Sequence, residues 1–493
     1  MHVALTRGTT HWEDLWNEGR IRGVAMDSRE VRPGDLYVAI RGRRWDGRAF
    51  IREAVARGAV CVVGEEDASS IDIPPGVPYV QVPSSRRAAS ALSNRAYGFP
   101  SRRLTVVGVT GTNGKTTCVH WLTHMLRSVG LRVGMLSSVS NETGLRTVPA
   151  ELTTLEAPKL HHALREMVDA GCTHAVIEVS SHGIVQHRTS DVDFDLAIFT
   201  NLTREHLDFH GSMANYAAAK ARLFSGLSSD KLGAVLNRDD PYADVMAESC
   251  VAPIITYGLH AGDVRGRVVE TDGWHTRLSV QLPGGEEFDG ILSHPGVYNV
   301  YNLLAVVAAA HALGLPADAI YGVISTLPSV PGRMHVIRPE RGPTVVVDYA
   351  HTPDALYQLL NTARQWTRGR VWLVFGGRGE RDKGKRPEMG FIAASLADRV
   401  LVTTDNPYSE EPARIADEIL SGARQVYGAK CDVVLDRAQA IEQAVLEASD
   451  GDVVVITGRG HESFQVIGAL RLERTDEDMV REALRRRPGA GAI

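Results

Sequence analysis

Residues 104–117 read LTVVGVTGTNGKTT, and this stretch decides how the chain is interpreted. Residues 104–110 are mostly apolar and predict a buried strand, whereas residues 115–129 predict a helix. A glycine-rich turn between a strand and a helix is the setting in which backbone N–H groups and a helix N-terminus bind phosphate. The segment therefore predicts an ATP site formed by Gly111, Thr112, Asn113, Gly114, Lys115, Thr116 and Thr117.

Two side chains in this turn have expected roles. Lys115 is placed to reach the outer phosphates, and the hydroxyl of Thr116 is a ligand for Mg²⁺. The match to the strict phosphate-loop pattern is incomplete, because that pattern has glycine at the position of Val109, whereas this chain has Gly108 and Gly111. An ordinary glycine-rich turn is the alternative interpretation, and the flanking strand and helix favour the phosphate loop.

Strands and helices alternate around this turn and predict an α/β protein of three domains. Residues 1–100 are expected to form a small N-terminal α/β domain, and residues 101–330 a P-loop-type ATPase domain with a mainly parallel sheet. Residues 331–493 are expected to form a Rossmann-like domain. The predicted strands are residues 132–136, 174–179 and 194–200 in the central domain and 344–348, 371–375, 399–403 and 453–457 in the C-terminal domain.

The composition is that of a globular protein. Of the 493 residues, 44% are hydrophobic and 23% are charged, and the formal net charge is −5 with Lys and Arg spread along the chain. This pattern excludes a basic nucleic-acid-binding chain, and the apolar segment 303–315 is too short to cross a bilayer. Five separated cysteines indicate neither a disulfide framework nor a zinc site. Because the first residues contain no apolar export signal, a cytoplasmic location is expected.

Three further residues are candidates for a metal site, although each has a simpler explanation. Glu178 ends an apolar strand, at the sheet edge where open α/β proteins bind ligands, but a solvated strand end is the competing interpretation. His206 also follows a predicted strand, where a hydrogen-bonded structural histidine is the more common case. Lys220 lies in a strongly helix-forming segment and, from the residues alone, is expected on the surface.

Several motifs together resemble the Mur ligase family, in its UDP-N-acetylmuramoyl-tripeptide synthetase branch, over nearly the whole chain. They are DSR at 27–29, GDLYVA at 34–39, EVSSHG at 178–183, DYAHTPD at 348–354 and RDKGKRP at 381–387. As a set these motifs are much more specific than the phosphate loop alone. The resemblance implies an N-terminal domain for a uridine nucleotide, a central ATP-binding domain and a C-terminal domain for an amino acid.

The resemblance also implies roles for individual residues. The UDP-linked substrate is expected to contact Ser28, Arg43, Arg44, Trp45, Thr153, Thr154, Ser180, Gln186 and Arg188. The adenine and ribose of ATP are expected near Asn299 or Asn302, Arg333 and Asp348. The incoming amino acid is expected to contact Arg381, Asp405, Asn406, Tyr408, Gly458 and Glu462.

For catalysis, the resemblance implies Lys115, Glu178, His206 and Lys220. Lys220 is similar in context to a family lysine that reacts with carbon dioxide to give N6-carboxylysine. That change turns a cation into an anion, which is expected to bind Mg²⁺ together with Thr116, Glu178 and His206. Because carbamate formation needs a neutral amine, we expect Lys220 to be desolvated, with a lowered pKa.

The implied reaction is an ATP-dependent amide synthesis that adds the third amino acid to UDP-N-acetylmuramoyl-L-alanyl-D-glutamate in peptidoglycan synthesis, through an acyl phosphate. Mg²⁺ is the expected cofactor and ATP the co-substrate. A monomer that acts on small molecules, without nucleic-acid or membrane partners, is expected. A different Mur-type ligase or a folylpolyglutamate-type ligase is the alternative enzyme, and a nucleotide-dependent switch is the alternative from another class.

Position 408 leaves the third amino acid open. Branch members that add meso-diaminopimelate usually carry arginine there, where its guanidinium can bind the distal carboxylate. This chain has Tyr408, which cannot supply that charge, whereas Glu462 would suit a side-chain ammonium. A diamino acid is therefore predicted, and diaminopimelate, lysine and ornithine all remain open.

Overall fold

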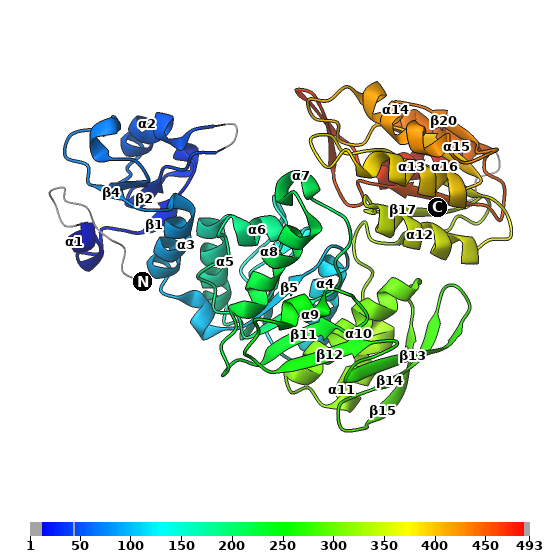
Figure 1. Cartoon of the computed structure of the whole chain (residues 1–493), viewed down its shortest axis with the longest axis horizontal. Coiled ribbons are helices and arrows are strands. Elements are labelled where there is room, and N and C mark those ends of the chain that lie inside the picture. Colours follow the sequence, from blue (N-terminus) through cyan, green and yellow to red (C-terminus); the bar gives the residue numbers. More distant parts are fainter. Residues whose placement is uncertain (1–11, 43–44, 488–493) are drawn as a thin grey trace.

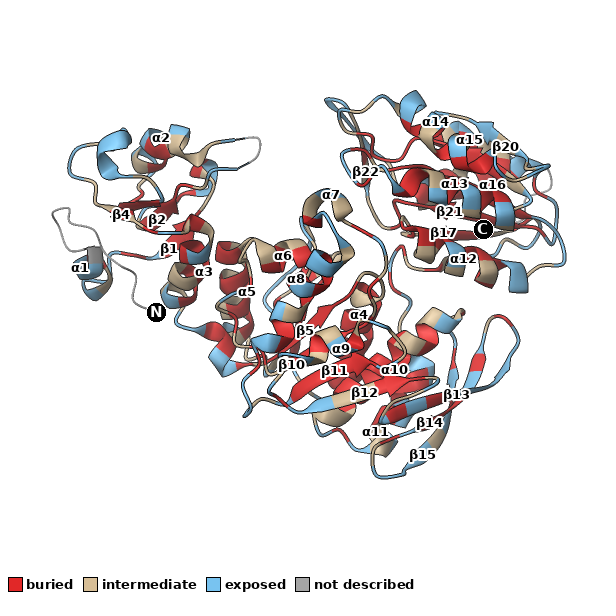
Figure 2. Cartoon of the chain, viewed as in Figure 1, coloured by how far each residue is buried: buried red, intermediate tan, exposed pale blue. Residues whose placement is uncertain are grey.

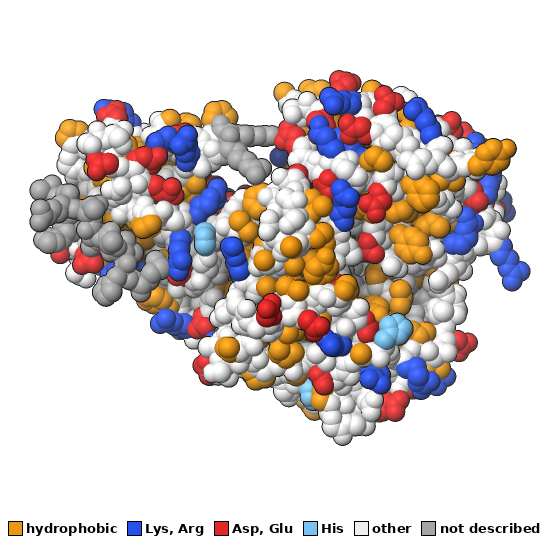
Figure 3. Space-filling model, viewed as in Figure 1, with side chains coloured by type: hydrophobic (Ala, Val, Ile, Leu, Met, Phe, Trp, Pro, Cys, Tyr) orange, Lys and Arg blue, Asp and Glu red, His pale blue; other side chains and the backbone are white. Residues whose placement is uncertain are grey.

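The computed structural model describes residues 12–42 and 45–487, which form three lobes (Figure 1). The N-terminal lobe (blue) and the C-terminal lobe (yellow to red) are each joined to a large middle lobe. The strands are largely buried, and the helices that cover them expose one side to solvent (Figure 2). Basic and acidic side chains are interspersed over the face seen in Figure 3. Within the described ranges, no helix has both the length and the apolar character needed to cross a membrane.

The N-terminal lobe contains a four-stranded parallel sheet in the order β1-β2-β3-β4. Because successive strand residues point to opposite faces, Leu36 and Val38 pack with α3 on one face, and Tyr37 and Ala39 pack with α2 on the other. The elements are α1 (Trp12–Asn17), β1 (Gly23–Ala25), β2 (Asp35–Val38), α2 (Ile51–Ala56), β3 (Cys61–Gly64), β4 (Tyr79–Gln81) and α3 (Ser85–Ala96).

The middle lobe contains an 11-stranded sheet in the order β15-β14-β13-β12-β11-β10-β5-β9-β6-β7-β8, parallel at its centre and antiparallel at both edges. Helices α4, α10 and α11 cover one face, and α5 and α8 cover the other. The strands are β5 (Thr105–Thr110), β6 (Val133–Leu136), β7 (Ser140–Glu142), β8 (Thr147–Pro149), β9 (His174–Glu178), β10 (Leu196–Phe199), β11 (Gly233–Asn237), β12 (Ile254–Gly258), β13 (Val264–Thr271), β14 (Thr276–Gln281) and β15 (Glu287–Leu292). The helices are α4 (Lys115–Ser128), α5 (Ala157–Asp169), α6 (Ser181–Val185), α7 (Leu207–His210), α8 (Met213–Ser225), α9 (Ala243–Ala247), α10 (Val297–Ala312) and α11 (Ala317–Val323).

The C-terminal lobe contains a six-stranded sheet in the order β16-β17-β21-β18-β19-β20, in which only the pairing of β16 with β17 is antiparallel. Helices α12, α13 and α14 cover one face, and α15 and α16 cover the other. The strands are β16 (His335–Ile337), β17 (Thr344–Asp348), β18 (Val371–Phe375), β19 (Arg399–Val402), β20 (Cys431–Val433) and β21 (Val453–Thr457), with a hairpin of β22 (Phe464–Ile467) and β23 (Leu470–Glu473). The helices are α12 (Pro353–Gln365), α13 (Lys385–Leu396), α14 (Pro412–Ala423), α15 (Arg437–Glu447) and α16 (Asp476–Arg486).

The predicted fold class, three α/β units with mainly parallel sheets, is confirmed. The strands predicted for the central and C-terminal domains begin and end within two residues of the expected positions. Strands β13 to β15 were not predicted, because β13 and β15 expose much of their length and lack the apolar runs of the central strands. The boundaries near residues 100 and 330, which fall between the sheets, remain our proposal.

Candidate active site

The phosphate loop connects β5 to α4 at the carboxyl edge of the parallel strands. Gly111 has φ 149° and Gly114 has φ 85°, a region that favours glycine. A Cβ atom on Gly111 would lie 1.8 Å from Thr200 Oγ1, and one on Gly114 would lie 2.2 Å from Asn302 Oδ1. Thr200 Oγ1 also donates to the carbonyl of Asn113 at 2.6 Å. The loop is thus held in one shape, in which glycine is required twice.

The side chains of two lysines meet at the carbonyl oxygen of Gly111. Lys115 Nζ donates to it at 3.0 Å and to the carbonyl of Thr112 at 2.9 Å. Lys220 Nζ donates to the Gly111 oxygen at 2.7 Å and lies 4.7 Å from the centre of the Tyr216 ring. Because Lys220 is only 1% exposed, the surface position predicted from its helix composition is wrong.

Burial lowers the pKa of both lysines. The pKa of Lys220 falls well below its ordinary value, first through burial and then through the positive charge of Lys115. The pKa of Lys115 is also lowered by burial, but the carboxylate of Glu178 acts in the opposite direction. Lys220 is therefore the amine that loses its proton more readily, and a neutral amine is the form that reacts as a nucleophile.

Glu178 and Thr116 supply oxygen atoms next to the loop. Glu178, at the end of β9 and 1% exposed, accepts the N–H of Ser138 at 2.7 Å, and Thr116 Oγ1 lies 3.0 Å from Ser138 Oγ. A carboxylate and a hydroxyl are ligands of the kind that Mg²⁺ prefers, so these residues fit that ion. Among residues 12–42 and 45–487, no three His, Cys, Asp or Glu side chains are grouped as a metal site. Mg²⁺ would need further oxygen atoms, from phosphate or from a modified Lys220.

His206 lies beside the two lysines in an uncommon backbone conformation, with φ 57°. Its Nδ1 is buried and has no hydrogen-bond partner among the described residues. Burial first, and then the charges of His182 and Lys220, lower the pKa of His206 well below its ordinary value. Since Mg²⁺ prefers oxygen ligands, this neutral imidazole fits a hydrogen bond to a bound phosphate better than a metal bond.

A cavity of about 330 Å³ opens between the phosphate loop, α10 and the C-terminal lobe. The predicted ATP-binding residues that line it are Asn113, Gly114, Thr117, Asn299, Asn302, Arg333 and Asp348. Gly111, Thr112, Lys115 and Thr116 lie on the adjoining loop and helix start. The remaining lining includes Trp121, Tyr298 and Tyr349, which suit an apolar ring such as a base. The cavity thus combines an apolar wall with the start of the phosphate loop.

Four residues predicted for the UDP-linked substrate form one hydrogen-bonded group next to Glu178. Thr154 Oγ1 donates to the carbonyl of Glu178 at 2.9 Å and lies 3.0 Å from Ser180 Oγ. Arg188 Nη1 donates to the carbonyl of Thr154 at 2.6 Å, and its Nη2 donates to Gln186 Oε1 at 2.7 Å. Thr153 directly precedes Thr154, so this predicted residue lies in the same loop.

The other residues predicted for this substrate belong to the N-terminal lobe. Ser28 Oγ donates to Glu53 Oε2 at 3.0 Å, and Trp45 is 74% exposed. Arg43 and Arg44 lie outside the described residues. Lys159 Nζ of α5 reaches Glu30 of this lobe at 2.9 Å, which is a direct contact between the two lobes.

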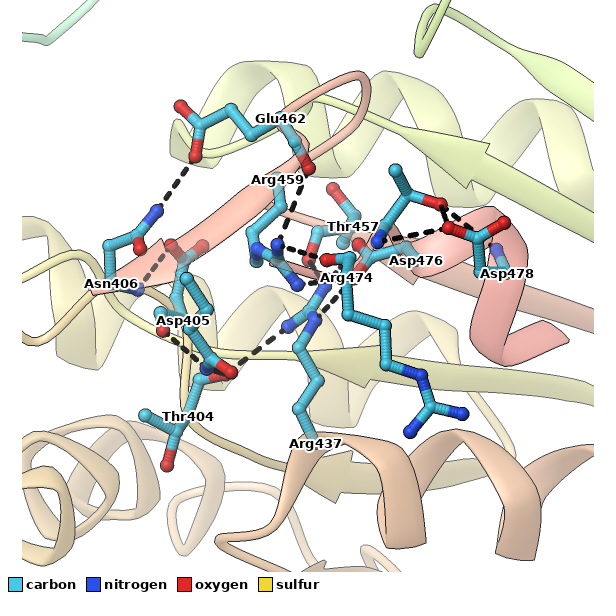
Figure 4. Close-up of polar contacts among 12 residues, drawn as sticks. Thr404, Asp405, Asn406, Arg437, Thr457, Arg459, Glu462, Arg474, Asp476 and Asp478 are labelled. Atoms are coloured by element: carbon cyan, nitrogen blue, oxygen red, sulfur yellow. Dashed lines mark hydrogen bonds and ion pairs between the residues drawn. The ribbon is translucent and has the colours of Figure 1, made fainter. Parts of the chain in front are cut away.

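The residues predicted for the amino acid follow the ends of β19 and β21. Asn406 Nδ2 donates to Glu462 Oε2 at 2.7 Å (Figure 4). Gly458 has φ 111°, and a Cβ atom there would lie 2.2 Å from Asp405 Oδ2. Asp405, Asn406, Gly458 and Glu462 are thus brought together, and we call these four residues the amino-acid group. Tyr408, two residues after Asn406, has φ 53°.

Arg381 lies two residues after Gly379, whose N–H donates to the carbonyl of Asn406 at 2.9 Å. It is exposed, and its charge contributes, after burial, to lowering the pKa of His182 to about 4. The charge of Arg381 therefore acts on a histidine of the middle lobe.

Comparison with known proteins identifies the family. Residues 20–97 match the model described as Mur ligase family, catalytic domain, residues 109–310 match the Mur ligase middle domain, and residues 332–460 match the Mur ligase, glutamate ligase domain. The chain is a Mur ligase. The family predicted from the motifs is therefore confirmed.

Relatives that this Mur ligase matches over nearly their whole lengths share one name. A UDP-N-acetylmuramoyl-L-alanyl-D-glutamate--2,6-diaminopimelate ligase from Geobacillus thermodenitrificans is 38% identical, over 99% of both chains. The ligase of that name from Parabacteroides distasonis is 41% identical, over 94% of both chains. A solved structure with the same name has a TM-score of 0.64 at 33% identity, over 94% of both chains. The MurF ligase of Thermotoga maritima in complex with ADP, at 23% identity and a TM-score of 0.67 over 95% of this chain and 99% of that chain, shows the fold alone.

Two features of this Mur ligase were not predicted from its sequence. Lys385 Nζ lies 3.0 Å from both carboxylate oxygens of Glu205, and this buried ion pair joins the C-terminal lobe to the middle lobe. Arg378, within a run of glycines, places its guanidinium against Glu462 in the amino-acid group. A charged side chain in the GGRG segment at 376–379 was the available signal.

A buried ionic network lies next to the amino-acid group (Figure 4). Asp476 is fully buried and accepts from Arg437 Nε at 2.8 Å and Nη2 at 2.7 Å, and from Arg459 Nη1 at 3.0 Å. Arg437 Nη2 also donates to the carbonyl of Thr457 at 3.0 Å, and Arg459 Nη2 to that of Arg474 at 2.8 Å. One carboxylate therefore fixes two arginines, which in turn hold the end of β21 and the segment before α16.

Proposed function

We propose that this Mur ligase uses ATP to join diaminopimelate to UDP-N-acetylmuramoyl-L-alanyl-D-glutamate. The observation that carries the proposal is the meeting of Lys115, Lys220 and the glycine-rich loop at one carbonyl oxygen, beside a cavity with an apolar wall. Relatives named for this reaction align with the chain over 94% or more of its length. We also propose a cytoplasmic location and a monomeric state.

The reaction brings two anions together, and the residues at the loop are placed to reduce their repulsion. The γ-carboxylate of D-glutamate attacks the γ-phosphorus of ATP, the bond to ADP breaks, and an acyl phosphate forms. The incoming amine then attacks the acyl carbon, phosphate leaves, and loss of a proton gives the amide. Lys115 and the loop N–H groups stabilise charge on the phosphoryl oxygens, and no covalent bond to the protein is needed.

Mg²⁺, when bound, neutralises charge on phosphate oxygens. Glu178 and Thr116 are the residues that would hold it, with a carbamate on Lys220 as a third oxygen donor. We propose that this carbamate forms, because the Lys220 amine is buried and its pKa is well below the ordinary value. In the step, the neutral amine attacks carbon dioxide, a C–N bond forms, and the nitrogen releases a proton to solvent.

Phosphate release measured with each substrate omitted in turn tests the proposal. We expect release to require ATP, the UDP-linked dipeptide and the amino acid together, and we expect the tripeptide product to appear by mass. Release from ATP alone would indicate a nucleotide-dependent switch instead. Reaction with a folate acceptor, or with a tripeptide acceptor and D-alanyl-D-alanine, would indicate one of the other ligases of this fold.

Replacing Gly114 with alanine should lower kcat/KM for ATP by about 10- to 100-fold, which corresponds to a backbone and packing strain of about 1–3 kcal/mol. The new Cβ atom would lie 2.2 Å from Asn302 Oδ1, in a residue with φ 85°. Gly130→Ala is the matched control, because Gly130 has φ 86° but no atom within 4 Å of an added Cβ. Steady-state kinetics on both variants checks the expectation. An equal loss of kcat/KM for ATP in Gly114→Ala and Gly130→Ala would show that the shape of the phosphate loop is not required.

A further inference from the structure

Among the ion pairs of the described residues, Glu462 of the amino-acid group has one positively charged partner, the guanidinium of Arg378. Arg378 follows β18, and its side chain is 15% exposed. Nη1 donates to the hydroxyl of Tyr349 at 3.0 Å, Nη2 donates to Glu462 Oε1, and the ring of Tyr408 lies 6.0 Å from Cζ. Nε is buried with no hydrogen-bond partner in the described part of the chain. The Nε–H of this guanidinium is therefore buried without an acceptor, beside Glu462 and Tyr349.

Glu462, in contrast, has both of its carboxylate oxygens occupied. Oε1 accepts from Arg378 and, at 3.2 Å, from the hydroxyl of Tyr349, and Oε2 accepts from Asn406 Nδ2 at 2.7 Å. Its charge is already balanced by Arg378. A substrate that brings only an ammonium would have to compete with Arg378 for Glu462 and would leave the guanidinium without an anion, which is costly at a buried site.

A substrate whose far end carries both an ammonium and a carboxylate meets a different situation. Its carboxylate can pair with Arg378 while its ammonium pairs with Glu462, so one internal ion pair is exchanged for two. A guanidinium is suited to this exchange because its planar set of donors binds a carboxylate through two parallel hydrogen bonds. The uncharged aromatic ring of Tyr408 also lies near this guanidinium, 6.0 Å from its Cζ.

We propose that Arg378 is the residue that selects the third amino acid, by binding the distal carboxylate of a diamino dicarboxylic acid whose distal ammonium binds Glu462. The inference rests on the proposed function and names the residue that favours diaminopimelate over lysine and ornithine. Arg378 thus provides the guanidinium that position 408, a tyrosine, does not.

Kinetics of Arg378→Gln with two amino acids tests the inference. With ATP and the UDP-linked dipeptide saturating, we expect kcat/KM for meso-diaminopimelate to fall about 10- to 100-fold, mainly through KM, since a charge-assisted hydrogen bond contributes about 1.5–3 kcal/mol. We expect kcat/KM for L-lysine to stay the same or rise, and KM for ATP to be unchanged. Arg378→Lys keeps the charge but not the planar set of donors, so its kcat/KM for meso-diaminopimelate should lie between those of wild type and Arg378→Gln. Arg414→Gln, whose arginine side chain is 72% exposed, is the matched control.

A second variant separates recognition from folding. In Arg378→Gln/Tyr408→Arg, a guanidinium is restored at a position whose ring lies 6.0 Å from Arg378 Cζ, and discrimination between diaminopimelate and lysine should return with it. Equal losses for both amino acids in Arg378→Gln, without recovery in the double variant, would assign Arg378 a structural role and overturn the inference.

Calorimetric titration of diaminopimelate into the wild-type chain and into Arg378→Gln gives a readout that needs no turnover. Ligation of diaminopimelate that is unaffected by Arg378→Gln would overturn the role of Arg378 and leave the proposed function intact. Binding that depends on Arg378 in a chain that never forms the tripeptide would overturn the proposed function and leave the role of Arg378 intact.

Discussion

Lys220→Ala should lower the ligation rate by about 10²- to 10³-fold, the scale seen when a charge-stabilising group is removed from an active site. Lys220 Nζ sits 2.7 Å from the Gly111 carbonyl, at the point where the phosphate loop turns towards Lys115. If the amine becomes a carbamate, the variant loses an anion beside the phosphate loop, and ATP should still bind because the loop sequence is unchanged. Single-turnover formation of the acyl phosphate and equilibrium binding of an ATP analogue separate the two effects.

The control for Lys220→Ala lies on the same helix. Arg222 is exposed on α8, so Arg222→Ala removes a positive charge from the helix without touching the loop, and it should keep near-normal activity. Recovery of Lys220→Ala by added short-chain carboxylic acids, and a labelled carbamate carbon in wild-type protein supplied with ¹³C-bicarbonate, would support the modification. Full activity of Lys220→Ala without any additive would exclude a role for this residue.

Lys220 also predicts a pH dependence of stability. The folded chain lowers the pKa of this amine well below the ordinary value of 10.5, whereas the unfolded chain restores it. At pH values between the folded and the unfolded pKa, the unfolded state binds one more proton than the folded state. The free energy of unfolding therefore rises with pH across this range and stops rising above about 10.5. Lys220→Met should remove this pH dependence, so the variant should be more stable than wild type at neutral pH. Thermal unfolding in carbonate-free buffers at several pH values would measure the difference.

The central strands of the fold were predictable from the sequence because they are buried on both sides. Strands β5, β18 and β21 are apolar runs between turn residues, and such a local pattern is enough to indicate a buried parallel strand. The antiparallel extension β13 to β15 was not predictable in the same way, because only one face of it is covered.

The site was predictable only where its residues are close in sequence. The phosphate loop is one continuous segment, so its glycines and Lys115 can be recognised from the local sequence alone. Lys220 lies 109 residues from the oxygen it contacts, and its local sequence favours an exposed helix, so the family resemblance alone pointed to it. Arg378 and Glu462 are 84 residues apart, and their pairing depends on two strand ends that meet only in the folded sheet.

Asp476→Asn should destabilise the C-terminal lobe by about 3–5 kcal/mol, the cost of breaking a buried ion pair from one side. Asp476, with no exposed surface, is the anion shared by Arg437 and Arg459, both of which are also buried. Asparagine keeps the size of the side chain but removes the charge and one acceptor, which leaves two guanidinium groups unbalanced in the interior. The amide exchange of β19 and β21 should therefore accelerate far more than that of the middle lobe, as measured by hydrogen–deuterium exchange.

Asp478→Asn, two residues further along α16, is the matched comparison. Asp478 completes an exposed capping box with Thr475, so its replacement should cost about 1 kcal/mol and fray only the helix start. The two variants make the same chemical change in the same helix, so the difference between them isolates burial and the paired arginines. Because Arg437 and Arg459 hold the carbonyls of Thr457 and Glu462, Asp476→Asn should also raise KM for the amino acid while leaving KM for ATP nearly unchanged. Equal exchange rates in the two variants would mean that the arginines find other partners and that the amino-acid group does not depend on this network.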